Sequence, residues 1–181
     1  MFIIETNLTH HALSILFQSI ENGCISSLQT LQLGSNNLSS CFVELAQAIR
    51  MGGFHSLQIL SLSHCRLNSQ SFLHFVYAMH DQPLQQLTTL HLAGNSLHTD
   101  SISYLATLLN RDFLPSLEYL NLSDNPLGDD GVHILLASMD CQALHTLCLN
   151  HCHLTDDCVM TVVHNIQTLM IPSLKLLQIR G

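Results

Sequence analysis

The segment LQTLQLGSNNL, residues 28–38, decides the fold because close variants of it follow four more times along the chain. Leucines take its first, fourth, sixth and eleventh places, and Asn36 takes the ninth. The same spacing begins again at residues 57, 87, 117 and 144, so that successive copies start 27 to 30 residues apart. A fixed period of this length indicates a solenoid of stacked units.

Incomplete copies extend the pattern to both ends of the chain. Apolar residues take its leucine positions at Ile3, Leu8, Leu174, Leu177 and Ile179. The sequence therefore predicts a single repeat domain over residues 1–181. Because the open ends of a solenoid need caps, two alternatives stay open: the chain is part of a longer array, or a partner or second copy covers its ends.

Each unit divides into two halves with different periodicities. Alternation such as Leu60-Ser61-Leu62 turns apolar side chains to one face, which predicts a short strand. In the second half, apolar residues recur at i, i+3, i+4 and i+7, which predicts a helix with one buried stripe. The predicted stripes are Leu13, Leu16, Phe17 and Ile20; Phe42, Leu45, Ala46 and Ile49; Phe72, Phe75, Val76 and Met79; Ile102, Leu105, Ala106 and Leu109; Val132, Leu135, Leu136 and Met139; and Val159, Val162, Val163 and Ile166.

Polar residues mark where these helices should begin and end. Carboxylates gather at the expected starts, where they can cap free N–H groups and oppose the positive end of the helix dipole. They are Asp100, Asp129, Asp130, Asp156 and Asp157. The pair Gly52-Gly53 follows an expected helix and predicts a helix stop with a turn, not a phosphate-binding loop.

Units of this length, with a full helix and with Asn or Cys in the ninth place, resemble the ribonuclease-inhibitor-like class of leucine-rich repeat proteins over essentially the whole chain. The resemblance implies an α/β fold, a right-handed solenoid that forms a horseshoe segment. A parallel β-sheet would line its concave face and helices its convex face. It also implies a buried ladder of ninth-place residues that bond the loop backbone of neighbouring units: Asn36, Cys65, Asn95, Asn125 and Cys152.

Composition indicates a protein that does not enter a membrane. Although 47% of the residues are hydrophobic, no stretch is apolar over the roughly 20 residues that a spanning helix needs. The start Met1-Phe2-Ile3-Ile4-Glu5 has no basic segment before its apolar residues, so no signal peptide is expected. Seven cysteines without a regular framework favour reduced thiols and a cytoplasmic location.

The charge balance argues against nucleic acid and anionic membranes as partners. Five Lys and Arg residues stand against 13 Asp and Glu residues, which gives a formal net charge of −8. Binding to phosphates requires a basic surface. The 13 histidines could alter this charge in acid, but their number alone does not establish a pH switch.

Metal binding and catalysis are weighed as alternatives to a binding surface. A metal site could use the region Cys148–Cys158, which contains Cys148, His151, Cys152, His153, Asp156, Asp157 and Cys158. Against it, the paired spacing C-x2-C of structural zinc sites is absent. No sequence motif of a nucleophilic, phosphate-binding or zinc-dependent enzyme occurs either. We therefore expect no enzyme activity and no cofactor.

What remains is the surface that the strands expose on the concave face. Most of these side chains are small and uncharged, and Tyr119 is the bulky exception. Exposed Tyr and His near the centre of such a face can anchor a partner, although they can also be ordinary solvent-facing strand residues. The predicted partner-binding residues are His91, Tyr119, Asn121, Asp124, Gln32, Ser61, Glu118, Cys148, Asn150, His64 and His151.

The leading functional hypothesis is a protein-binding module that grips a folded partner with this face and the adjacent loops. By resemblance to the ribonuclease-inhibitor class, the partner could be an enzyme whose active site becomes covered. Two settings stay open. One is the sensor or scaffold segment of a larger innate-immune-type protein. The other is an effector of an intracellular bacterium such as Legionella, acting in the host-cell cytoplasm on a host protein or on another effector.

Overall fold

Strands and helices alternate without exception in the part of the chain that the computed structural model describes, residues 8–168 and 173–181. The element order is α1 His10–Glu21, β1 Thr30–Gln32, α2 Phe42–Arg50, β2 Ile59–Ser61, α3 Ser69–Asp81, β3 Thr89–His91, α4 Thr99–Ala106, β4 Tyr119–Asn121, α5 Gly128–Ser138, β5 Thr146–Cys148, α6 Asp156–Thr168 and β6 Leu176–Gln178. The predicted unit position Ile3 lies outside the described residues.

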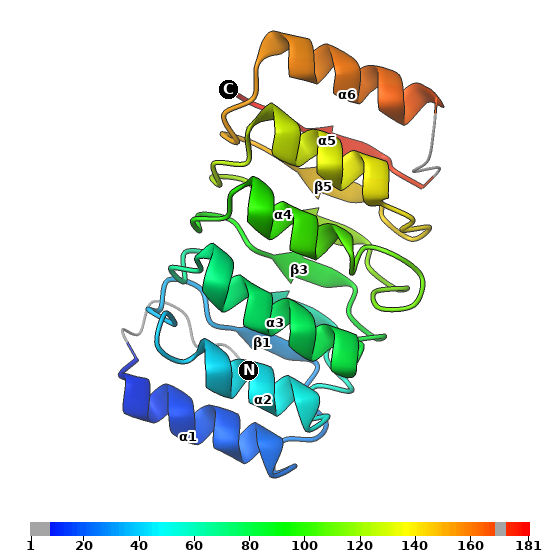
Figure 1. Cartoon of the computed structure of the whole chain (residues 1–181). Coiled ribbons are helices and arrows are strands. Elements are labelled where there is room, and N and C mark those ends of the chain that lie inside the picture. Colours follow the sequence, from blue (N-terminus) through cyan, green and yellow to red (C-terminus); the bar gives the residue numbers. More distant parts are fainter. Residues whose placement is uncertain (1–7, 169–172) are drawn as a thin grey trace.

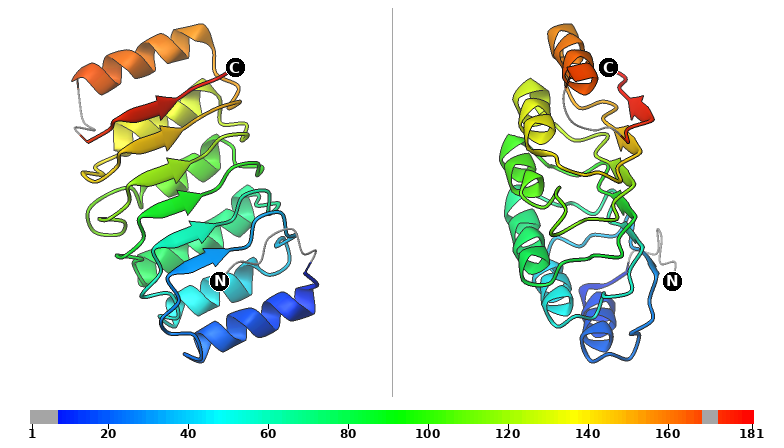
Figure 2. Two further views of the ribbon diagram at one scale, coloured as in Figure 1. Left: turned by 180° about the vertical axis from the view of Figure 1, so that it is seen from behind. Right: turned by 90° about the vertical axis from the view of Figure 1, so that its right-hand side faces the viewer.

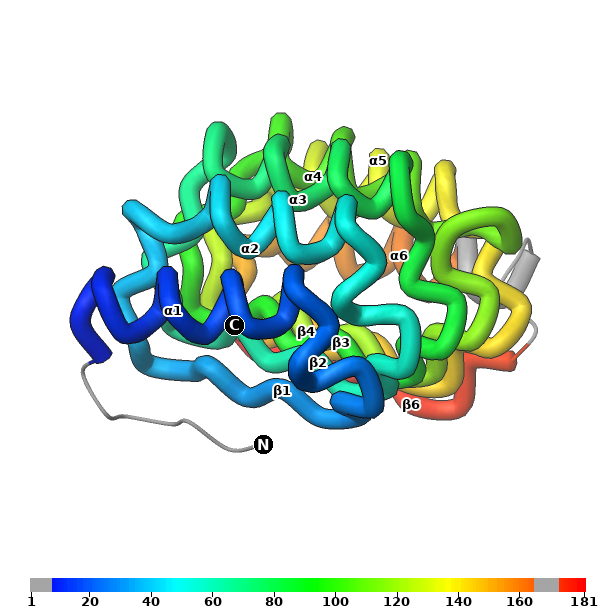
Figure 3. Tube along the Cα trace, turned by 90° about the horizontal axis from the view of Figure 1, so that it is seen from below, coloured from blue at the N-terminus to red at the C-terminus, as the bar shows by residue number. Residues whose placement is uncertain are grey.

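The six strands form one parallel sheet in the order β1-β2-β3-β4-β5-β6. Each helix from α2 to α6 therefore connects neighbouring strands, and the stack has two layers, a row of strands and a row of helices (Figure 1). In the right-hand view of Figure 2, the row of helices curves outward, away from the strands. Figure 3 shows the helices and the strands as two separate layers. We call the sheet surface that faces away from the helices the concave face. The predicted leucine-rich repeat solenoid is confirmed.

The core follows from the period of the leucines. At the middle position of each strand pair, leucine lies beside leucine, as Leu60 does beside Leu31 and Leu90. These leucines are buried in β1 to β5 and partly buried in β6, and the stripes predicted for α1 to α5 are buried as well. The core is thus a continuous column of nearest-neighbour contacts between units.

The stripe predicted for α6 is wrong in part. Its buried side chains are Cys158 and Val162, whereas Val163 is 41% exposed. The equivalent residue of α5, Leu136, is buried. The difference has a simple cause: each inner helix has a neighbour on both sides, but among the described elements α6 contacts only α5. The side chain of Ile166 lies outside the described part.

The helix caps also differ from expectation. The predicted carboxylates do lie in the first turns of α4, α5 and α6, but His98 and Leu127 at the N-caps of α4 and α5 make no side-chain cap bond. The side chains that do cap helices are Thr9 on α1, Asn68 on α3 and Thr155 on α6. Asp129 instead accepts hydrogen bonds from the backbone and hydroxyl of Thr155 in the next unit. The predicted stop at Gly52-Gly53 is confirmed, because α2 ends at Arg50 and Gly52 has a φ of +76°.

The ninth-place residues form the expected ladder. Asn95 accepts hydrogen bonds from the backbone N–H groups of Cys65 and Leu67 in the preceding unit, both at 3.0 Å. Its amide nitrogen donates to the carbonyls of Leu62 and Leu92 at 2.9 and 2.8 Å. Each such asparagine therefore satisfies buried backbone groups of two units at once.

Cysteine in the ninth place bonds the loop backbone in a different way. The thiol of Cys65 donates to Leu33 O at 3.3 Å, but it cannot reproduce the paired acceptance of an amide oxygen. The backbone compensates: Arg66, directly after Cys65, has a φ of 59°, and the carbonyl of Cys65 accepts from Leu38 N at 3.1 Å. The Cys152 unit repeats this turn, with His153 at a φ of 59°.

Candidate interaction surface on the concave face

The parallel register places the predicted strand residues in one row across the sheet. Register pairs join each member to the next in the order Gln32, Ser61, His91, Asn121, Cys148 and Gln178. A second row in front of it contains Tyr119, which pairs with Thr89 on β3 and Thr146 on β5. Both rows belong to the concave face because the leucines between them are buried.

Tyr119 lies at the centre of this surface with contacts to both neighbouring strands. Its ring packs against His91 of β3, with ring centroids 5.0 Å apart and an interplanar angle of 47°. On the other side, the thiol of Cys148 on β5 donates to the Tyr119 hydroxyl at 3.5 Å. The three side chains therefore form a connected row over β3, β4 and β5.

Burial changes the titration of both aromatic residues. Burial lowers the pKa of His91 below its ordinary value, so the imidazole is neutral at pH 7. Burial, and after it the neighbouring Cys148, raise the pKa of Tyr119 to about 12. The His91 imidazole and the Tyr119 hydroxyl are consequently uncharged at physiological pH.

Cys148 does not have the exposure that its place in the strand row predicts. It occupies the predicted row but is only 2% exposed. Its row neighbours Gln32, Ser61, His91 and Asn121 are all half-buried. Tyr119 of the neighbouring strand contacts its thiol, and this contact between strands could not be deduced from alternation alone. Cys148 therefore supports the surface from beneath and is not accessible to a partner.

Asn121 and the turn after β4 form a chain of hydrogen bonds beside Tyr119. The Asn121 side-chain oxygen accepts from Ser123 N at 3.0 Å, and the Ser123 hydroxyl accepts from Asn150 N at 3.2 Å. Asn150 Oδ1 is buried and has no partner in the described part of the chain. Ser123 was not among the predicted site residues; its position shortly after the strand, two residues beyond Asn121, was the only signal in the sequence.

Two carboxylates flank β4 at its opposite ends. Glu118 precedes the strand and Asp124 follows it, and both are exposed. Asp124 takes a left-handed conformation with a φ of 57°, and its N–H donates to Asn150 O at 2.8 Å. Neither carboxylate forms an ion pair with a residue in the described ranges. We refer to His91, Tyr119, Asn121 and Asp124 as the central patch.

The predicted residues His64 and His151 lie in the turns after their strands. Both are exposed and left-handed, with φ values of 55° and 53°. The ring of His64 lies against Gly94 of the next unit, so closely that a Cβ on Gly94 would come within 2.0 Å of His64 Nδ1. Neither histidine has a described contact with the central patch. They belong to the rim of the concave face.

The region Cys148–Cys158, weighed as a metal site, places its potential ligands apart. Cys148, Cys152 and Cys158 are buried, whereas His151 and His153 are exposed. Cys152 uses its thiol in the ladder, donating to Leu122 O at 3.4 Å. Across residues 8–168 and 173–181, no group of three or more His, Cys, Asp or Glu side chains is arranged to hold a metal ion. The seven cysteines are all free thiols.

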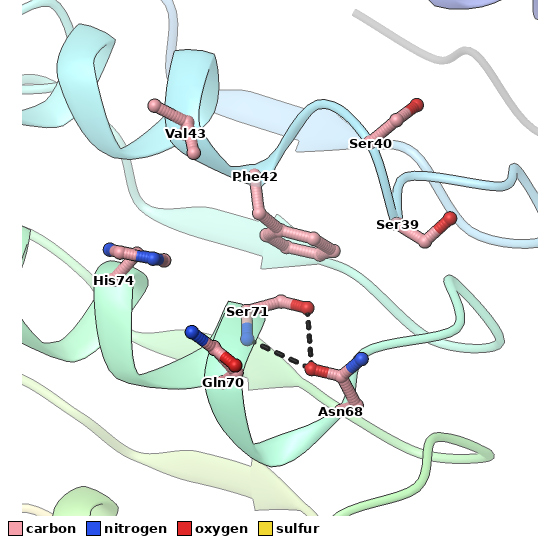
Figure 4. Close-up of a pocket in the computed structure, with 8 residues that line it drawn as sticks. All are labelled: Ser39, Ser40, Phe42, Val43, Asn68, Gln70, Ser71 and His74. Atoms are coloured by element: carbon pink, nitrogen blue, oxygen red, sulfur yellow. Dashed lines mark hydrogen bonds between the residues drawn. The ribbon is translucent and has the colours of Figure 1, made fainter.

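A pocket with a volume of about 260 Å³ lies between the N-terminal ends of α2 and α3, outside the predicted surface. Phe42 points into it and Val43 stands on its rim (Figure 4). Polar side chains without formal charge line the rest: Ser39, Ser40, Asn68, Gln70, Ser71 and His74. Asn68 is occupied by capping α3 through Ser71. This pocket could not be predicted from the repeat pattern, because its lining comes from two different units.

None of the helices in the described ranges has the length and apolar character required to cross a membrane.

Comparisons with known proteins agree with the repeat fold. A family described as Leucine Rich Repeat matches residues 56–76, and one described as Leucine Rich repeat matches residues 113–133. Human NACHT, LRR and PYD domains-containing protein 13 is similar to this chain, with 34% identity over 107 residues. That alignment covers 56% of this chain and 10% of the human protein, so the chain corresponds to a small part of that relative.

A solved structure shares the fold at low sequence identity. Leiomodin-1 Actin-Binding Site 2 matches with a TM-score of 0.65 and 14% identity, over 78% of this chain and 80% of that one. At this identity the likeness concerns the fold alone. The repeated motif, the alternating strands and helices of the described units and the two family matches together identify the chain as a leucine-rich repeat protein.

Proposed function

We propose that this protein is a protein-interaction module that binds a folded partner with its concave face and the strand-to-helix turns beside it. Leucine-rich repeat folds generally serve as binding surfaces, and the solenoid presents an extended sheet for this purpose. The observation that supports the proposal most is the placement of Tyr119. A large aromatic side chain is held between His91 and Cys148 in the middle of a surface of small polar residues.

The chemistry of the central patch favours a protein over other partners. Tyr and its neighbours offer apolar contact area with hydrogen-bonding groups, which is typical of the residues that dominate protein interfaces. The chain has 13 acidic against 5 basic residues, which disfavours contact with phosphate-rich surfaces. Glu118 and Asp124 lie at the two ends of β4. Their negative charges would attract a partner that carries a basic side chain close to its contact with Tyr119.

Related proteins support this class of function without fixing the partner. The solved leiomodin-1 structure is named as an actin-binding site, and the human relative is named as containing leucine-rich repeats. Two finer proposals follow. In the first, the partner is an enzyme whose active site is covered, as the ribonuclease-inhibitor class does. In the second, this chain acts as a sensor or scaffold segment within a larger assembly.

The proposal is tested by affinity capture followed by quantitative binding of each recovered partner to variants. Tyr119→Ala should weaken binding by about 30-fold, since a central aromatic anchor contributes about 2 kcal/mol or more. Tyr77→Ala is the matched control, because Tyr77 is 53% exposed on α3 and belongs to the opposite layer. Binding that survives Tyr119→Ala but is lost with Tyr77→Ala would place the interface on the helices.

The enzyme-inhibitor proposal has its own readout. If a captured partner is an enzyme, a stoichiometric amount of this protein should suppress its turnover, and Tyr119→Ala should restore it. Binding without any change in turnover would support the scaffold proposal instead.

A further inference from the structure

A residue with left-handed backbone recurs at the same place in the repeat, directly before the ninth position. Ser35, His64, Gly94, Asp124 and His151 occupy this place, with φ values of 60°, 55°, 64°, 57° and 53°. In each of these units, the N–H of this residue donates to a carbonyl oxygen of the next unit at 2.7 to 2.9 Å. The conformation therefore belongs to the repeated turn and does not depend on the side chain.

Glycine is the residue that fits this turn without strain. Residues with a Cβ carry a steric cost in the left-handed region, which is smaller for Asp and His than for branched residues but still larger than for glycine. Gly94 shows that the turn accepts glycine. The other four units therefore keep a side chain here at a conformational cost.

Asp124 and His151 are the members of this row that gain nothing from the rest of the chain. Both are exposed, and neither side chain forms a hydrogen bond or an ion pair with another residue in the described part of the chain. Ser35 is partly buried, and the His64 ring lies against Gly94. Because backbone strain persists where function depends on it, the benefit of Asp124 and His151 lies outside the chain.

The two residues are neighbours beside the central patch. Asp124 N donates to Asn150 O, the carbonyl directly before His151. They follow β4 and β5, the two strands that Tyr119 joins through its contact with Cys148. An unpaired carboxylate attracts a cationic side chain, and an imidazole beside it supplies a second hydrogen-bonding group. The formal net charge of −8 favours a cationic group of the partner as well.

We propose that Asp124 and His151 are specificity-determining residues at the edge of the concave face, and that together they bind a lysine or arginine side chain of the partner protein. This inference rests on the proposed function. It assigns the chemistry of one partner residue and the two side chains that recognise it.

The first test needs no partner and uses urea unfolding followed by circular dichroism. Asp124→Gly and His151→Gly should unfold at midpoints equal to or above that of the parent, because glycine relieves the strain and no side-chain bond is lost. Asp124→Ala is the matched control, since it removes the same carboxylate but keeps a Cβ in the left-handed region. Equal midpoints for Asp124→Gly and Asp124→Ala, both below the parent, would overturn the inference, because the carboxylate would then support the fold.

The second test measures binding of the partner recovered by affinity capture. Asp124→Gly should weaken it about fivefold, which is the effect of one exposed ion pair. Asp124→Asn should do the same, because it keeps the shape of the side chain without the charge. Ser35→Gly is the matched control: it makes the same backbone change in the turn after β1 and should bind like the parent. Added salt should weaken binding of the parent more steeply than binding of Asp124→Asn.

The outcomes separate this inference from the proposed function. If Tyr119→Ala weakens binding while Asp124→Gly and His151→Gly bind as tightly as the parent, the inference is wrong and the proposed function stands. If all three bind like the parent, the proposed function fails as well. A loss in Ser35→Gly equal to that in Asp124→Gly would also overturn the inference, because the effect would then come from the backbone of the turn.

Discussion

The substitution Asn95→Ala tests the ladder where an asparagine bridges two units. The side chain is buried, and its oxygen accepts from Cys65 N and Leu67 N, both at 3.0 Å. Its nitrogen donates to the carbonyls of Leu62, Leu92 and Ala93. Alanine removes all of these bonds and offers no replacement.

The size of the effect follows from the groups left without a partner. Each buried backbone N–H that loses its acceptor costs about 1–3 kcal/mol. With two such groups, Asn95→Ala should lower the free energy of unfolding by about 4 kcal/mol. Cys65→Ala is the comparison, because it removes a single weak thiol donor shared by Leu33 O and Ser63 O. Its expected cost is about 1–2 kcal/mol.

Urea unfolding, followed by circular dichroism at 222 nm, measures both variants against the parent. The midpoints should fall in the order parent, Cys65→Ala, Asn95→Ala, with unchanged slopes. Equal losses in the two variants would refute the reasoning, because they would mean that the amide bonds contribute no more than the thiol.

Three further predictions use the turns and titrating groups. Gly94 and Gly128 both have a φ of +64°, but of these two only Gly94 has a close neighbour, the His64 ring. Gly128→Ala should cost about 1 kcal/mol in unfolding free energy, and Gly94→Ala clearly more. Removing the His64 ring as well should abolish this difference. Hydrogen bonds from Thr155 lower the pKa of Asp129, so the stability that this carboxylate contributes is present above about pH 4 and is lost as the pH falls through its folded-state pKa. In Asp129→Asn, the urea midpoint should therefore decrease less between about pH 5 and pH 3 than it does in the parent. Burial lowers the pKa of His91, so stability should fall as the pH drops below about 6.5, and a pH series of urea midpoints should show a shallower fall in His91→Gln.

Most of the fold could be predicted because the same spacing of apolar residues recurs in every unit. The spacing of Leu28, Leu31 and Leu33 fixes a strand and a buried face, and five copies make the register unambiguous. The clearest error occurs in α6, which has a described neighbour on one side only. Val163 follows the helical pattern, yet it is exposed because no described element covers that side of α6.

The candidate site could be predicted only as a row of positions. Alternation placed Tyr119, His91 and Cys148 on the concave face, but it carries no information about contacts between strands. Tyr119 reaches sideways onto Cys148, so an expected surface residue is buried. For the same reason, Tyr119→Ala should cost about 1–2 kcal/mol in unfolding free energy, because a ring contact and a hydrogen bond are lost.

Hydrogen exchange of the protein with and without a captured partner tests the central proposal most directly. Backbone amides in β3, β4, β5 and the turns that follow them should exchange more slowly in the complex, with the largest change around Tyr119 and Asp124. Amides in α3, α4 and α5 should be unaffected apart from small general stabilisation. Protection confined to those helices, with the strands and their turns unchanged, would contradict binding through the concave face.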